Sequence, residues 1–181
     1  MVVDEKGLIR AMKEAYKADG YKVAVEDKAD IENVIIAAPL WTVVIQKSEL
    51  PRKVLGLIAE HLGEIPFPGT AYQVQKKQTQ TEIFSMVAGA VMDFHSGEKE
   101  KRIVRRTNLT VGGYPIWQAA DKRVVEVNPD REDIMSSSTV RLIGDDLLMI
   151  DDDVSRAYIR CYTPKEEKEL EQLRYLSQFQ W

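Results

Sequence analysis

The sequence predicts an α+β protein built mainly from an antiparallel sheet. From Arg102 onward, short apolar runs alternate with turn residues, which is typical of a long meander of strands. The strands also come in runs, without the strict β-α-β alternation of a parallel sheet. Apolar residues at helical spacing mark helices near the N-terminus, at about 50–62, and at the C-terminus, with a further helix competing with a strand at about 80–95.

The N-terminal segment predicts a helix over about residues 4–18. Asp4 can cap its first turn, and Gly20 follows its end. Its apolar residues fall on one face at helical spacing: Leu8, Ile9, Met12, Ala15 and Tyr16. The period then changes to that of strands, which we expect at 21–26, 34–38 and 41–46.

A second helix is expected over 50–62, with Pro51 in its first turn and Gly63 at its end. It carries a continuous apolar stripe, formed by Leu50, Val54, Leu57, Ile58 and Leu62. The turn region 65–70 follows and could divide the chain into an α-β-β-β-α half and a half made of the meander plus a helix. Because this region is short, we expect residues 1–181 to form a single domain.

The central segment allows two interpretations. Residues 71–77 favour a strand, and Thr79 and Glu82 have the spacing of a capping box before an apolar run. A helix at about 80–95 would be apolar on nearly all sides, which indicates a buried helix. Gly89 costs a helix about 1 kcal/mol relative to alanine, so a strand competes.

The second half of the sequence predicts a meander followed by a helix. The last helix is expected from Thr163, where Pro164 and Glu166 complete a second capping box. Its apolar face would hold Leu170, Leu173, Leu176 and Phe179. Residues 128–138 are polar and predict a longer loop. The six expected strands lie at 103–109, 115–119, 123–127, 140–143, 147–150 and 155–162.

Composition predicts a soluble protein of the cytoplasm. Cys161 is the only cysteine, which excludes an internal disulfide and a site of several cysteines. The longest nearly uncharged apolar stretch, 83–94, is too short for a bilayer, which needs about 20 residues, so no membrane partner is expected. The net charge of −4 is unevenly spread, with +3 over 65–119 and −6 over 120–153. Such asymmetry can steer partners.

The densest candidate surface is basic. It could follow a phosphate backbone and stack bases, and it comprises Lys99, Lys101, Arg102, Arg105, Arg106, Tyr114 and Trp117. No recognised nucleic-acid-binding motif accompanies it, and a pI near 5.4 is low for such a protein. We therefore treat these residues as a surface for an unknown macromolecular partner or for self-association, and do not favour nucleic acid.

Other candidate residues favour structural roles. His61 and His95 lack metal-ligand spacing, Cys161 lies on the apolar side of a predicted strand, and the aspartates at 145–146 and 151–153 fall where turns prefer aspartate. No catalytic, cofactor or metal residue is assigned. The sequence favours a non-enzymatic interaction or accessory protein. The alternatives are a weak nucleic-acid-associated protein that uses the 99–106 cluster, and an enzyme with a dispersed site around His61 or His95.

Overall fold

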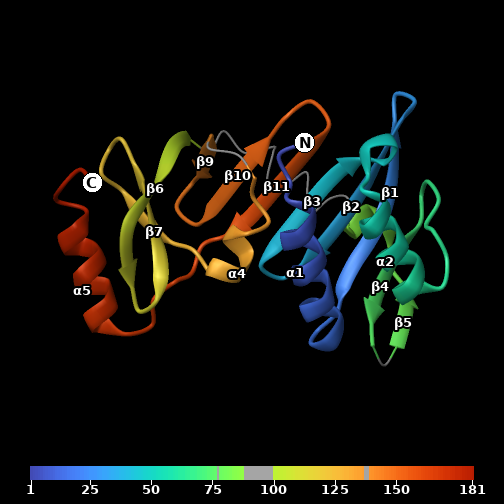
Figure 1. The fold of residues 1–181 in the computed structure, drawn as a ribbon, viewed down its shortest axis with the longest axis horizontal. Coiled ribbons are helices and arrows are strands. Elements are labelled where there is room, and N and C mark those ends of the chain that lie inside the picture. Colours follow the sequence, from blue (N-terminus) through green and yellow to red (C-terminus); the bar gives the residue numbers. More distant parts are fainter. Residues whose placement is uncertain (77, 88–99, 137–138) are drawn as a thin grey trace.

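The chain folds around one antiparallel sheet in the computed structural model, which describes residues 1–76, 78–87, 100–136 and 139–181. Within these residues eleven strands follow the order β5-β4-β1-β2-β3-β11-β10-β9-β6-β7-β8 (Figure 1). Every neighbouring pair is antiparallel. The α+β class and the mainly antiparallel sheet are therefore confirmed.

Most strands lie close to their predicted ranges, whereas β5 and α4 were not predicted and α5 begins later than predicted. The strands are β1 (Tyr21–Lys28), β2 (Ile31–Ala38), β3 (Trp41–Gln46), β4 (Ala71–Gln75), β5 (Gln78–Thr81), β6 (Lys101–Val111), β7 (Tyr114–Ala119), β8 (Val124–Glu126), β9 (Val140–Ile143), β10 (Leu147–Asp151) and β11 (Ser155–Arg160). The helices are α1 (Glu5–Lys17), a 3-10 turn (Lys47–Glu49), α2 (Arg52–Leu62), α4 (Pro129–Glu132) and α5 (Glu167–Leu176).

The helices α1 and α2 cover one face of the sheet near β1 and β4 (Figure 1). Asp4 caps α1, and its Oδ1 accepts a hydrogen bond from the Gly7 amide at 2.7 Å. The helix buries Leu8, Ala11 and Met12 against the core. Apolar residues at helical spacing, which predicted this helix, thus also pack it against the core.

The second helix is also confirmed, with a later start. Pro51 takes the cap position, so α2 begins at Arg52, and Leu50 is buried just before the helix. The stripe residues Val54, Leu57 and Ile58 are buried in the same core as α1. Gly63 ends the helix with a left-handed backbone, as expected for a residue without a side chain.

The turn region at 65–70 connects α2 to β4, the strand on which α2 packs. The strands that follow it, β4 and β5, extend the sheet from β1, so they lie beside the first strands of the chain. The first and second halves of the sheet meet where β3 pairs with β11, from Ser155 opposite Ile45 to Ile159 opposite Trp41.

The predicted start of the central helix is wrong. Residues Gln78–Thr81 form β5 and pair with β4, so that Thr79 lies opposite Val74 and caps no helix. The hairpin supplies backbone partners to this segment, and strand pairing outweighs the local capping pattern. Residues 84–87 are helical, and the rest of the expected helix, 88–95, lies outside the described residues.

The second half forms two runs of three consecutive strands, β6-β7-β8 and β9-β10-β11, placed side by side by pairing of β9 with β6. Between them, the loop predicted at 128–138 contains the short helix α4. Asn128 caps it and accepts a hydrogen bond from the Asp130 amide, and Pro129 occupies its first turn. A cap followed by proline is a helix-start signal that the polar composition of this segment conceals.

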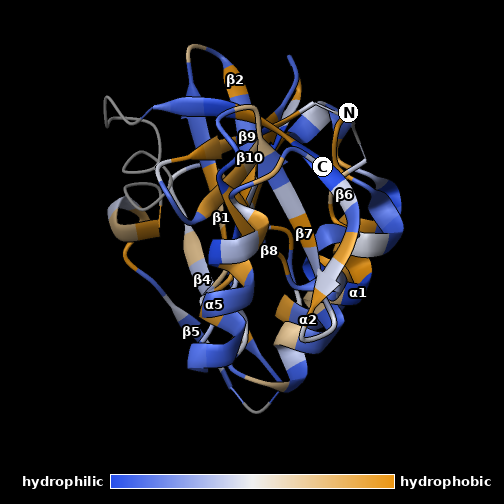
Figure 2. Ribbon diagram, turned by 90° about the vertical axis from the view of Figure 1, so that its left-hand side faces the viewer, coloured by the Kyte–Doolittle hydropathy of each residue, from blue (hydrophilic) through white to orange (hydrophobic). Residues whose placement is uncertain are grey.

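The C-terminal helix begins later than predicted. Tyr162 donates its backbone N–H to the Glu126 carbonyl, which keeps the chain extended past β11, and α5 starts at Glu167 with Glu166 as its cap. The Thr163 capping box is therefore not formed. None of the residues of α5 is fully buried, and Figure 2 shows a largely hydrophilic helix against the sheet.

Candidate functional site

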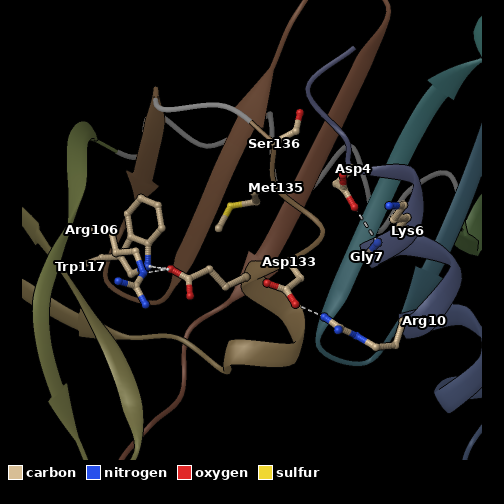
Figure 3. Close-up of a pocket in the computed structure, with 10 residues that line it drawn as sticks. Asp4, Lys6, Gly7, Arg10, Arg106, Trp117, Asp133, Met135 and Ser136 are labelled. Carbon is tan, nitrogen blue, oxygen red and sulfur yellow. Dashed lines mark hydrogen bonds and ion pairs between the residues drawn. The ribbon is translucent and has the colours of Figure 1, made fainter.

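An open cleft lies between the start of α1 and the region of α4, and its volume is about 700 Å³ (Figure 3). Two backbone contacts bring its walls together. The Asp4 amide donates to the Ile134 carbonyl at 2.8 Å, and Val3 forms an isolated β-bridge with Met135. The lining residues are Asp4, Lys6, Gly7, Arg10, Arg106, Trp117, Glu132, Asp133, Met135 and Ser136.

A glycine makes this close approach possible. A Cβ atom at Gly7 would stand 1.9 Å from the Asp133 carbonyl oxygen, which is far shorter than any non-bonded contact allows. Glycine is unfavourable inside a helix by about 1 kcal/mol relative to alanine. Its presence in α1 is explained by the backbone that packs against it.

One wall of the cleft is a hydrogen-bonded triad. Arg106 and Trp117 lie opposite each other on β6 and β7, and both donate to Oε1 of Glu132 on α4, at 2.7 and 3.0 Å (Figure 3). The Trp117 side chain is 6% exposed and the Glu132 side chain is mostly covered. These contacts fix the orientation of the Arg106 guanidinium at the edge of the cleft.

The facing wall is more open. Arg10 of α1 forms an ion pair with Asp133, and the two side chains are 46% and 56% exposed. Lys6 lies on the solvent side of the same helix and belongs to none of the ion pairs found among the described residues. The cleft therefore presents three cations and three carboxylates along its length.

The predicted basic surface is divided between two faces of the sheet. Alternation along β6 places Arg102 and Arg106 on one face and Lys101 and Arg105 on the other. Arg102 forms ion pairs with Glu100 and Asp121. Lys99 lies outside the described residues.

The two aromatic residues predicted for this surface also separate. Tyr114 stacks on Tyr162 with ring centroids 4.2 Å apart, on the side of the sheet near α5. Trp117 points into the cleft on the opposite side. No contact between Tyr114 and Trp117 arises from this arrangement, and their role in an interaction surface stays a prediction.

His61 occupies an aromatic setting. Its ring stacks on Tyr16 at 3.7 Å between centroids, and its Nδ1 lies 3.1 Å from the Tyr21 hydroxyl. Burial lowers the pKa of His61 below its usual value. His95 lies outside the described residues. Over the described ranges, no group of three or more His, Cys, Asp or Glu side chains is arranged to hold a metal ion.

The acidic turn residues and the cysteine have structural surroundings. Asp145, Asp146 and Asp151 form ion pairs with arginines, and Asp152 accepts hydrogen bonds from the amides of Val154 and Ser155. Cys161 is buried, which confirms the interpretation drawn from strand alternation, and burial raises the pKa of its thiol to about 12.

Sequence reasoning did not find most of the cleft. Its walls come from segments more than a hundred residues apart, and the charged residues of α1 look like an ordinary solvated helix face. The local signal that could have pointed to it is Gly7, because a glycine within an otherwise amphipathic helix calls for a packing reason.

Comparisons with known proteins identify no relative of this chain. No protein-family model, no curated protein and no solved structure matches this chain. In the portion of the chain that is described, no helix has the length and apolar character needed to cross a membrane.

Proposed function

We propose that this chain is a non-enzymatic interaction protein and that the cleft between α1 and α4 receives a charged segment of a protein partner. The observation that carries the proposal is the composition of the cleft, which is lined by Arg10, Arg106, Trp117 and Met135 among others. Arginine, tryptophan and methionine are enriched at protein interfaces, and arginine and tryptophan supply many of their binding hot spots.

The two walls would contribute differently to binding. Arg106 is held in place by Glu132, so little side-chain entropy is lost when a partner carboxylate approaches it. The Arg10–Asp133 pair is exposed, and exposed pairs contribute only about 0–1 kcal/mol to stability. Exchanging that pair for contacts with a partner therefore costs little.

The partner we expect carries both signs of charge. Lys6 and Arg10 offer cations on one wall, while Asp133 offers an exposed carboxylate beside α4. An extended or helical segment with acidic and basic side chains would match both walls. Binding should weaken with salt, because exposed charges are screened beyond about 8–10 Å near physiological ionic strength. A second copy of this chain is one such partner.

The alternatives have less support. For nucleic acid, the cations of β6 are divided between the two faces of the sheet, with Arg102 and Arg106 on one face and Lys101 and Arg105 on the other. For an enzyme, His61 contacts two tyrosines, with no carboxylate within hydrogen-bond distance among the described residues. A single-domain protein of the cytoplasm stays our expectation.

Replacing Lys6 with a photoreactive amino acid tests the proposal, both in living cells that produce the protein and with the purified protein. We expect cross-links to one defined protein, or to a second copy, that decrease at high salt and are lost in Arg10→Glu. The matched control is Arg174→Glu, which reverses an exposed, ion-paired arginine on α5. Equal cross-linking in both variants, or none at low salt, would contradict the proposal.

A further inference from the structure

Glu126 is a buried acid to which the described residues offer no counter-charge. It is the last residue of β8 and is 1% exposed, and neither of its carboxyl oxygens has a hydrogen-bond partner within the described ranges. None of the ion pairs formed within the described residues includes it. Burying an ionised carboxylate in this way is costly, so the neutral acid is the form that fits the site.

The site of Glu126 lies under α5. Glu126 pairs with Ile116 of β7 and bridges to Tyr162, so its side chain shares the face of the sheet on which Ile116 and Tyr162 lie. Glu169 in the first turn of α5 approaches the same face, and its Oε1 stands 2.7 Å from the position of a Cβ atom at Gly112. The helix thus brings a second carboxylate toward the buried one.

The charge that acts on Glu126 is that of Glu169 on α5. Tyr162, which bridges to Glu126, stacks on Tyr114 and also lies near the carboxyl groups of Glu166 and Glu169. The nearest arginine in sequence, Arg123, forms an ion pair with Asp145 instead. An ionised Glu126 would meet repulsion from Glu169 and no compensating cation among the described ion pairs.

We propose that Glu126 is a proton-operated latch for α5, which stays docked on β6 and β8 while Glu126 is neutral and loosens when Glu126 ionises. The helix is suited to local release because none of its residues is fully buried. Elements with few buried contacts open at lower free energy than the core. The proposal does not depend on the cleft, because at β7 the cleft and Glu126 lie on opposite faces of the sheet.

The direction of the pH effect follows from the difference between the pKa of Glu126 when α5 is docked and its pKa when α5 is released. Burial, and then the charge of Glu169, raise the pKa of Glu126 from its ordinary 4.5 to about 7 when α5 is docked. With α5 released, Glu126 meets water and regains a pKa near the ordinary value. Docking is therefore strongest below about pH 4.5, weakens as the pH rises toward 7, and levels off above it.

Hydrogen exchange of the α5 amides, Glu167–Leu176, tests the latch when intrinsic exchange rates are corrected for pH. Between about pH 6 and about pH 8, we expect the opening equilibrium of α5 to rise about tenfold. In Glu126→Gln, which stays neutral, the corrected opening should not change with pH. Glu171→Gln removes an exposed acid from the same helix and should retain the wild-type response.

A pH-independent α5 in the wild type, or an unchanged response in Glu126→Gln, would overturn the latch. If Glu126→Gln fails to fold, the carboxyl carbon of Glu126 can be titrated in the wild type by NMR. A midpoint well above 4.5, with α5 amides that shift in step, supports the proposal. A midpoint near 4.5 overturns it.

Discussion

The side-chain oxygen of Gln118 accepts a hydrogen bond from the backbone N–H of Trp181 at 2.8 Å. Its Nε2 donates to the Phe179 carbonyl at 2.7 Å, so one buried amide on β7 holds the segment that follows α5. Gln118→Ala should free this segment and lower the free energy of unfolding by about 1 kcal/mol.

Hydrogen exchange at 179–181 and chemical denaturation measure the effect of Gln118→Ala. Gln172→Ala, which removes an exposed amide from α5, serves as the control and should change neither quantity. Unchanged protection of the Trp181 amide in Gln118→Ala would show that other contacts hold the segment.

Two glycines in helices should respond in opposite ways to alanine. Gly7→Ala places a methyl group against the Asp133 carbonyl, so it should destabilise the protein despite the better helix propensity of alanine. Gly56→Ala on α2 meets nothing within 4 Å and should stabilise by about 0.5–1 kcal/mol. Thermal unfolding of the two variants measures both changes in stability. If Gly7→Ala raises the stability, α1 and α4 do not approach as closely as described.

The two candidate capping residues should differ in energy. Asp4→Ala removes the acceptor of the Gly7 amide and should cost about 0.5–2 kcal/mol. Thr163→Ala should change stability by less than about 0.5 kcal/mol, because Thr163 is exposed and caps no helix. Urea denaturation of both variants checks this difference. A large cost for Thr163→Ala would indicate that α5 begins earlier.

Cys161 should resist labelling in the folded protein. Its thiol is buried and its pKa is raised to about 12, so the reactive thiolate is scarce at neutral and mildly alkaline pH. A thiol reagent at pH 8 should react slowly with the native protein and rapidly after denaturation. Rapid stoichiometric reaction of the native form would show that β11 opens near Cys161.

The predictable parts of the fold are those in which local pattern and tertiary contact agree. The stripe of Val54, Leu57 and Ile58 faces the core because that is the only way to bury it. Alternation placed Cys161 inward for the same reason. In both cases the side chains that define the pattern also make the packing.

The failures arose where a distant strand supplied backbone partners. Thr79–Glu82 and Thr163–Glu166 both have the spacing of capping boxes, yet β4 pairs with the first segment and Glu126 bridges the residue before the second. The charged cleft escaped prediction because α1 and α4 meet only in the folded chain. Glu126 has no local signature either, since alternation in a three-residue strand is too brief to reveal a buried acid.

The pairing of β3 with β11 has a consequence for biosynthesis. The second edge of β3 is covered by a strand that begins about 110 residues later in the chain. At about 5–20 residues per second, a ribosome needs about 5–20 s to deliver it. During that interval the edge from Trp41 to Gln46 lacks its final neighbour, and an unpaired strand edge is a template for pairing with another chain.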